Sequence, residues 1–139
     1  MTQNAALPLL FTPMSLRSVS LPNRIVVPPM AQYTADDGVA NDFHQVHYGK
    51  FALGGAGTVF VEATGVTREG RITNGCLGRW NDTQQRAFQP ITRLIRSRGA
   101  VPAIQIGHGG RKSSMQRPWF GNGPLNAQPQ PAGPVLSPR

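Results

Sequence analysis

The sequence predicts an α/β fold in which parallel strands alternate with helices. Three short runs predict buried parallel strands: 25–27 is apolar on both faces, 58–63 is a β-branched apolar run that turns polar only at Glu62, and 101–106 is the third. They begin 33 and 43 residues apart, which is the spacing of repeating strand–helix crossover units. Patterns typical of amphipathic helices fill the two gaps. We therefore expect a leading hairpin followed by strand, helix, strand, helix and strand.

The segment before this repeat predicts a hairpin. From Leu9 to Arg24, apolar and polar residues alternate around turn-forming residues, as they do in short antiparallel strands. The run Ile25–Val27 then predicts the first buried strand. This strand should end sharply, because the two prolines that follow it have no N–H to donate to a sheet.

The first helix is predicted from Asn41, a good N-cap residue, to the glycines at 54–57. Phe43, Val46 and His47 fall on one helical face, so we expect this face to be the buried one. The glycine-rich stretch is interpreted as a turn. It does not predict a dinucleotide-binding loop, because it lacks that spacing and precedes a strand instead of opening a helix.

The second helix begins after Asn81, which forms a weak capping box with Gln84. Its termination is predicted at Gly99. Pro90 lies inside this helix and costs up to about 3 kcal/mol unless the helix kinks. Apolar residues follow at helical spacing: Ala87, Phe88, Ile91, Leu94 and Ile95.

Composition limits the classes of function. The chain has 139 residues and a formal net charge of +8, but its arginines are mostly scattered and no aromatic residues are interleaved to stack on bases. We therefore expect no nucleic-acid binding, and rank a small basic binding module last. Cys76 is the single cysteine, which excludes a disulfide within one chain and fits a reducing compartment.

The chain is expected to be cytoplasmic and to bind no membrane. Its first residues lack a basic leader, and Pro8 and Pro13 interrupt their apolar run, so they do not resemble a secretory signal. No segment approaches the roughly 20 apolar residues of a membrane span. The end of the chain differs in composition, since 121–139 contains five prolines and no acidic residue. We divide the chain into 1–120 and a Pro/Gly-rich loop or disordered tail at 121–139.

Three groups of residues follow the predicted strands, where parallel α/β folds bind ligands. After the first strand, the backbone amides of Met30 and Ala31 and the phenol of Tyr33 suit a flat heteroaromatic ligand, although spacing alone favours a simple proline-rich turn. The turn Glu62–Thr64 follows the second strand. Gln105, at the end of the third, can donate to and accept from a pyrimidine-like ring edge, or simply cap the sheet.

Two histidine-containing stretches leave alternatives open. His108, Arg111 and Lys112 lie beside glycines after the third strand, and fit either an anionic cofactor, such as nicotinamide phosphate, or a solvated loop. His44 and His47 are one helical turn apart but lack the glutamate of a zinc-hydrolase helix, so core or surface histidines are favoured there. No metal site is predicted.

Several of these segments together resemble one known family. PNRIVVPPMAQY, DFHQVHYGKFALGGAGTVFVEATGVTREGRIT, IQIGHGGRK and RPWFGNGPL closely resemble the N-terminal part of old yellow enzyme family proteins (NADH:flavin oxidoreductases), especially the bacterial xenobiotic reductase branch. The likeness runs in order and with few gaps from about Leu10 to Leu125. It is therefore much more specific than any single motif.

The resemblance implies the N-terminal portion of a TIM (β/α)8 barrel with FMN at the carboxyl ends of its strands. The whole protein would be an ene-reductase that takes a hydride from NADPH or NADH and passes it to an activated alkene or other electrophile. Tyr33 matches a hydroxyl on the substrate side. The family's cofactor-binding positions match Pro28, Pro29, Met30, Ala31, Ala63 and Gln105.

One position departs from the family pattern. Where relatives usually have Cys or Thr beside the flavin, this chain has Ala31, which carries no polar atom to tune the flavin's redox behaviour. We therefore expect a redox potential and a substrate range that differ from those of Cys-bearing relatives.

A complete barrel needs roughly 200 to 250 residues or more, whereas we identify three of its strands. In similar proteins the histidine pair that holds the substrate, an arginine at the flavin and the phosphate-binding loops come from later strands, so no catalytic residue is identified here. We expect one piece of a flavoenzyme, completed by further sequence or by a complementing chain; a homo-oligomer is the other assembly expected. The alternative is a truncated, non-catalytic product that cannot bind FMN alone, with an open sheet edge and uncovered apolar faces.

Overall fold

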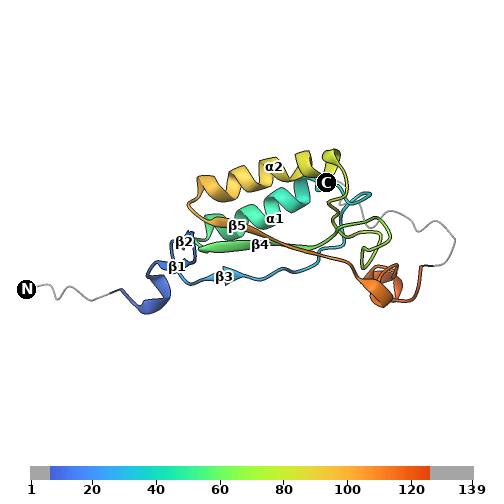
Figure 1. Ribbon diagram of the computed structural model, residues 1–139, viewed down its shortest axis with the longest axis horizontal. Coiled ribbons are helices and arrows are strands. Elements are labelled where there is room, and N and C mark those ends of the chain that lie inside the picture. The colour runs from blue at the N-terminus through green and yellow to red at the C-terminus, as the bar shows by residue number, and fades with distance from the viewer. Residues whose placement is uncertain (1–6, 126–139) are drawn as a thin grey trace, which may run out of the picture.

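A three-stranded parallel sheet with two helices on one face forms the body of the molecule (Figure 1). The computed structural model describes residues 7–125. Its sheet has the order β3 (Val26–Val27), β4 (Thr58–Gly65) and β5 (Val101–Gly107). Helix α1 (Asp42–Leu53) connects β3 to β4, and α2 (Asp82–Ser97) connects β4 to β5. The predicted alternation of parallel strands and helices is confirmed, with strand ends shifted by one or two residues.

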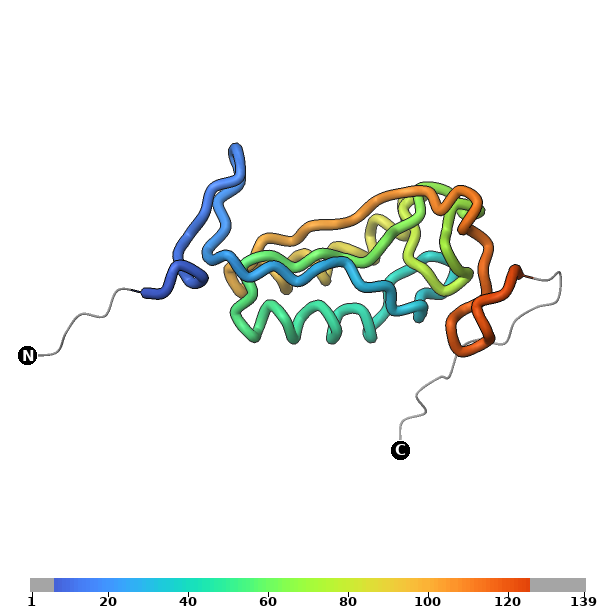
Figure 2. Tube along the Cα trace, turned by 90° about the horizontal axis from the view of Figure 1, so that it is seen from below, coloured from blue at the N-terminus to red at the C-terminus, as the bar shows by residue number. Residues whose placement is uncertain are grey.

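The predicted hairpin is also confirmed. Strands β1 (Met14–Leu16) and β2 (Val19–Leu21) pair antiparallel, after a short 3-10 turn at Leu9–Phe11. Figure 2 shows the hairpin at the end of the sheet where the parallel strands begin, and the loops that follow β4 and β5 at the opposite end. The carboxyl ends of the strands therefore face those loops and not the hairpin.

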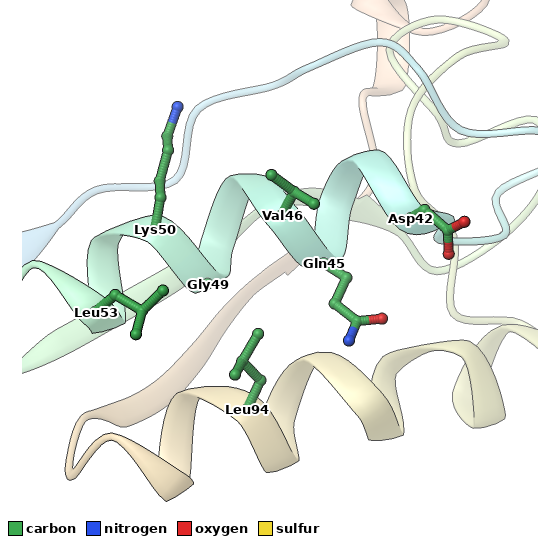
Figure 3. Close-up of a pocket in the computed structure, with 7 residues that line it drawn as sticks. All are labelled: Asp42, Gln45, Val46, Gly49, Lys50, Leu53 and Leu94. Atoms are coloured by element: carbon green, nitrogen blue, oxygen red, sulfur yellow. The ribbon is translucent and has the colours of Figure 1, made fainter. Parts of the chain in front are cut away.

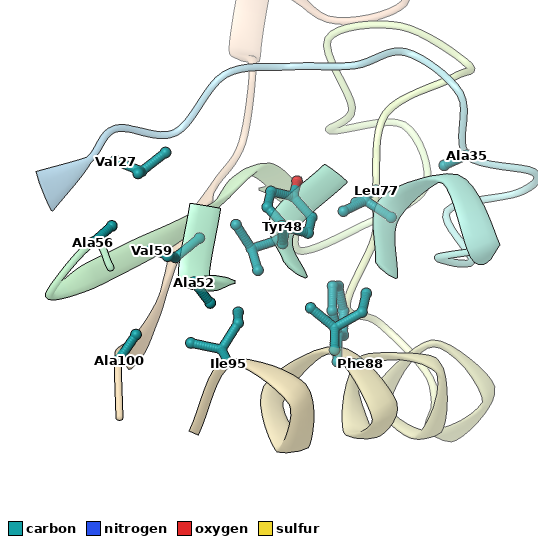
Figure 4. Packing of buried hydrophobic residues seen from close by; sticks show 12 residues of the cluster. Val27, Ala35, Tyr48, Ala52, Ala56, Val59, Leu77, Phe88, Ile95 and Ala100 are labelled. Carbon is teal, nitrogen blue, oxygen red and sulfur yellow. The ribbon is translucent and has the colours of Figure 1, made fainter. Parts of the chain in front are cut away.

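The hydrophobic core lies between the sheet and the helices (Figure 4). Val59 and Val61 of β4 pack there with Ile91 and Ile95 of α2 and with Tyr48 of α1, and each of these side chains is at most 2% exposed. Burying an aliphatic side chain of this size stabilises a fold by about 1.5 to 3 kcal/mol. The opposite face of the sheet carries no helix within the described residues.

The buried face of α1 is not the one that its apolar residues predicted. Phe43 and Val46 are 39% and 70% exposed, so only His47 of the predicted face is buried. The physical reason is that α1 docks through polar residues that find partners in the sheet, and through a glycine against which Leu94 of α2 packs. The residues actually buried are His44, His47, Tyr48, Gly49 and Ala52.

Helix α2 follows its prediction closely. Asn81 Oδ1 accepts the Gln84 backbone N–H at 3.1 Å, and Gln84 Oε1 accepts the Asn81 N–H at 3.3 Å, which is the expected capping box. The helix continues through Pro90 to Ser97, and Gly99 follows with φ +78°. Phe88, Ile91 and Ile95 of its predicted apolar stripe are buried, while Leu94 packs against Gly49 of α1.

The chain after β5 is an ordered loop as far as it is described. Short 3-10 turns occupy Gly110–Lys112 and Pro118–Phe120. The backbone N–H of Leu125 then donates to Ser114 O at 2.8 Å, which folds the start of the 121–139 segment back onto the loop. Its remainder, from residue 126, lies outside the described residues. Within residues 7–125, neither helix is long and apolar enough to cross a membrane.

Candidate functional site

Two of the predicted site residues come together at the carboxyl end of the sheet. Ala63 of β4 and Gln105 of β5 are direct partners in the parallel register. Neighbouring strands lie about 5 Å apart, and side chains at paired positions share a face. Gln105 is exposed and Ala63 partly so, which leaves both accessible to a ligand.

A β-bulge sets the orientation of Ala63. The register between β4 and β5 shifts between Val61 and Ala63, so Glu62 is the extra residue. The two less buried residues of β4, Phe60 and Ala63, are consequently three positions apart instead of two. Glu62 contacts α1, whereas the burial pattern puts Ala63 on the face without helices.

The segment Pro28–Tyr33 is attached to the same end of the sheet. It leaves β3 directly after Val27, which pairs with Val59. The backbone N–H of Gln32 donates to Glu62 Oε2 at 2.8 Å. The structure therefore brings the ends of β3, β4 and β5 to one edge, and the predicted residues with them. Met30 is 40% exposed there, while Ala31 and Tyr33 are half-buried.

A buried polar network lies directly beneath this segment. Glu62 and His44 are 0% exposed, and Tyr48 is 1% exposed. The Tyr48 hydroxyl donates to Glu62 Oε1 at 3.1 Å and accepts the Glu62 backbone N–H at 3.0 Å. His44 Nε2 lies 3.4 Å from the same carboxylate oxygen. Burial, followed by the negative charge of Glu62, raises the pKa of Tyr48, so its hydroxyl stays protonated and can donate.

The network continues to the start of α1. His44 Nδ1 lies 2.8 Å from Asn41 Oδ1, and the Asn41 side-chain amide donates to Thr34 O at 2.9 Å. Sequence reasoning recorded Glu62 only as the point where the second strand turns polar. The signal available was an ionisable residue inside a β-branched run, because such a residue needs buried partners.

An aromatic pair joins this segment to the loop after β5. The rings of Tyr33 and Trp119 meet edge to face, with centroids 6.1 Å apart and planes at 81°. Trp119 is 46% exposed and comes from the loop after β5. Burial, and secondarily Cys76 and Glu62, raises the pKa of Tyr33, so its phenol keeps its proton near neutral pH. Sequence analysis did not single out Trp119.

Arg117 holds this loop in place. It is 8% exposed, and its Nε donates to Asn74 Oδ1 at 3.3 Å. Its Nη2 reaches Ala35 O at 3.5 Å. Arg117 thus connects the loop after β5 with the loops after β3 and β4. Burial lowers the pKa of its guanidinium, although the charge of Asp36 opposes this.

The cationic group after β5 is exposed. His108 Nδ1 accepts the Gly110 N–H at 3.0 Å and its ring lies against Gly70. Arg111 and Lys112 follow in the 3-10 turn and are exposed. These positions are compatible with both predicted roles, a solvated loop and a contact to an anionic ligand.

The two histidines of α1 have different surroundings. His44 belongs to the polar network, whereas His47 packs among aromatic rings: it stacks on Phe43 at 5.9 Å and meets Phe51 edge to face at 5.2 Å. Burial and then the nearby Lys50 lower the pKa of His47. Within residues 7–125, no group of three His, Cys, Asp or Glu side chains is placed to hold a metal ion.

A groove of about 390 Å³ lies elsewhere, on the outer surface of the helices (Figure 3). None of its residues belongs to the strand ends, so we do not assign it to the candidate site. The lining consists of Asp42, Gln45, Val46, Gly49, Lys50 and Leu53 of α1 and Leu94 of α2.

Parallel strands that alternate with helices, in an arrangement shared with solved relatives, define the N-terminal part of a TIM barrel. The chain belongs to the NADH:flavin oxidoreductase / NADH oxidase family, whose model matches residues 9–134. This match continues beyond the division that composition suggested at residue 120.

Individual relatives agree with this assignment. An NADH:flavin oxidoreductase of Gibberella zeae is 41% identical over 119 residues, which cover 86% of this chain and 29% of the relative. Morphinone reductase in complex with tetrahydroNAD superposes with a TM-score of 0.71 at 34% identity, over 77% of this chain and 29% of that one. The old yellow enzyme homologue of Zymomonas mobilis gives a TM-score of 0.67 at 30% identity, over 73% and 28%. The chain thus spans less than a third of the length of these relatives.

Proposed function

We propose that the chain lines the flavin ring in an FMN-dependent NAD(P)H oxidoreductase of the ene-reductase type. The observation that carries this proposal is the pairing of Ala63 with Gln105 beside the anchored Pro28–Tyr33 segment. Family membership supports flavin and nicotinamide chemistry. The substrate would be an activated alkene or a related small electrophile.

The residues at the strand ends fit a flat flavin ring. Ala63 has only a methyl group, and the sheet face beside it carries no helix, so a planar ring has room to approach. The exposed amide of Gln105 can both donate and accept, as the pyrimidine edge of a flavin requires. Met30 adds a flexible apolar surface.

Each residue of the proposed site has a distinct role. Pro28, Pro29, Met30 and Ala31 would line the ring. Ala63 would contact it after β4, and Gln105 would pair with its pyrimidine edge. Tyr33, which keeps its proton, would donate a hydrogen bond to the substrate. Bound FMN would supply the hydride transfer between NADPH or NADH and the substrate. These residues would orient the ring and exclude water from it.

Ala31 would make the flavin of this protein differ from that of relatives with Cys or Thr at this position. Its side chain offers no polar atom to the ring. In flavin-loaded protein, Ala31→Cys should therefore change the redox potential and the relative rates with different electrophiles. An unchanged potential and substrate range would contradict this role.

Because the chain spans 29% of its relatives' length, we propose catalysis for a completed barrel. Further sequence or a complementing chain would supply the later strands, in a cytoplasmic protein. The uncovered sheet face also favours a second candidate, a non-catalytic fragment that cannot hold FMN alone.

A segment exchange tests the proposed function. Residues 9–134 would replace the equivalent segment of morphinone reductase, and the purified chimera would be assayed for flavin absorbance and NADH oxidation. We expect a yellow protein that oxidises NADH on adding an activated alkene. The matched control is morphinone reductase with its own segment in place. A folded but colourless chimera would argue against flavin binding by this segment.

A further inference from the structure

We propose that Glu62 is a positioning residue for the flavin site: its carboxylate holds the Pro28–Tyr33 segment in place through the backbone amide of Gln32. This assignment rests on the proposed function only for the identity of the ligand. The contact itself joins two atoms of this chain, Gln32 N and Glu62 Oε2, which lie 2.8 Å apart, and it involves no ligand.

The segment needs such an anchor because of its sequence. The β3–β4 pairing ends at Val27, and the two residues that follow are prolines, which have no N–H to donate. The next backbone bond to another element is from Ala35 N to Gly75 O, at 2.9 Å. Within residues 7–125, the Gln32 N–H is the one backbone donor between these points that is bonded outside its own segment.

The two oxygens of the Glu62 carboxylate accept hydrogen bonds from different parts of the chain. Oε1 takes the Tyr48 hydroxyl and lies beside His44, and both of these residues belong to α1. Oε2 takes the Gln32 amide. A fully buried carboxylate is costly unless it is paired and hydrogen-bonded, and here α1 fixes one oxygen so that the other presents a fixed acceptor.

The same residue links two parts of the candidate site. Glu62 is the bulged residue of β4, so its insertion turns it towards α1 and leaves Ala63 paired with Gln105. It also anchors the residue just before Tyr33, whose φ of +58° is uncommon for a side chain of this size. Glu62 thus fixes the spacing between the segment after β3 and the end of β4 without touching the ligand itself.

Amide hydrogen exchange in the 139-residue chain, without flavin, tests this inference. Glu62→Met removes both acceptor oxygens, and should raise the exchange rate of the Gln32 amide about tenfold or more. Glu62→Gln keeps an oxygen that can face Gln32, and should restore most of the protection. Glu69→Met makes the same change at an exposed glutamate, and should leave Gln32 unchanged.

Tyr48→Phe separates positioning from general stability. It removes a buried hydrogen bond to Oε1 but leaves Oε2 facing Gln32, so the Gln32 rate should change by no more than about threefold. The proposal would be overturned if the Gln32 exchange rate rose equally in Tyr48→Phe and Glu62→Met. It would also be overturned if Glu62→Met raised the exchange rate of the Val61 amide as much as that of Gln32, because Glu62 would then have a purely structural role. An unchanged Gln32 rate in Glu62→Met would overturn it as well.

FMN titration of the same variants, placed in the morphinone reductase chimera that carries residues 9–134, adds a separate readout. Glu62→Met should weaken FMN binding about tenfold, with Glu62→Gln close to the unmodified chimera. A folded chimera that binds no FMN would count against the proposed function, while exchange at Gln32 would still decide the role of Glu62.

Discussion

At the residue scale, close backbone approaches fix the loops around the candidate site. Gly75 lies where the loop after β4 meets the loop after β3, and an added Cβ would collide with the carbonyl group of Tyr33. The same Cβ would come within 2.5 Å of Arg117 Nε. Glycine is therefore required here because of space and not because of its backbone angles.

Gly75→Ala tests this crowding. We expect it to reduce the free energy of unfolding by about 1 to 3 kcal/mol, because both neighbouring loops must move. Gly107→Ala is the matched control, since a Cβ there meets nothing within 4 Å, and its effect should stay within about 0.5 kcal/mol. Urea unfolding followed by circular dichroism measures both. Equal losses in the two variants would show that crowding at Gly75 is not the cause.

The surroundings of His47 predict a dependence of stability on pH. Burial, then Lys50 and more weakly His44, favour the neutral ring, while Glu62 opposes them; the net result is a pKa below the ordinary value of 6.5. The unfolded chain thus binds a proton at His47 more readily than the folded chain. Stability from His47 is complete above pH 6.5 and is lost as the pH falls towards the lowered pKa.

Thermal unfolding at pH values on either side of 6.5 measures this effect. The chain should lose stability on the acidic side, and His47→Phe should reduce that loss, because phenylalanine fits the aromatic surroundings and cannot be protonated. A loss of the same size in both proteins would mean that other groups cause it.

At the element scale, the two helices show what a sequence pattern can and cannot predict. Helix α2 has a capping box and an apolar stripe at helical spacing, and the structure confirms both. Helix α1 has its apolar residues Phe43 and Val46 exposed, because its contact with the sheet is polar. The periodicity of apolar residues predicts the buried face of a helix only where that face is apolar. It does not indicate the hydrogen bonds between Tyr48 and Glu62 that allow polar groups to be buried here.

Pro90 gives a prediction at this scale. It leaves the carbonyl group of Arg86 without the usual helical donor, yet α2 continues through it. Pro90→Ala should therefore stabilise the chain, by about 2 kcal/mol after allowing for the greater freedom of the unfolded state. Chemical denaturation measures the change. A loss of stability would show that the proline ring, which is partly buried, contributes more by packing than the missing hydrogen bond costs.

At the scale of the whole molecule, the order of strands and their parallel direction follow from sequence. Runs that are apolar on both faces, separated by helices, leave few other topologies. The placement of Ala63 opposite Gln105 could not be derived that way, because it depends on a bulge at Glu62. Likewise, the contact of Tyr33 with Trp119 joins residues far apart in the chain, and no local pattern indicates it.

The central claim is that the paired strand ends bind the flavin ring, and titration of FMN by quenching of its fluorescence tests it most directly. The morphinone reductase chimera that carries residues 9–134 should bind FMN saturably, and Gln105→Leu in this chimera should weaken binding about tenfold, since the lost hydrogen bonds are worth about 1.4 kcal/mol. Gln89→Leu, the same change on the exposed side of α2, should leave the affinity unchanged. An absence of saturable binding, or equal affinity in all three proteins, would contradict the account.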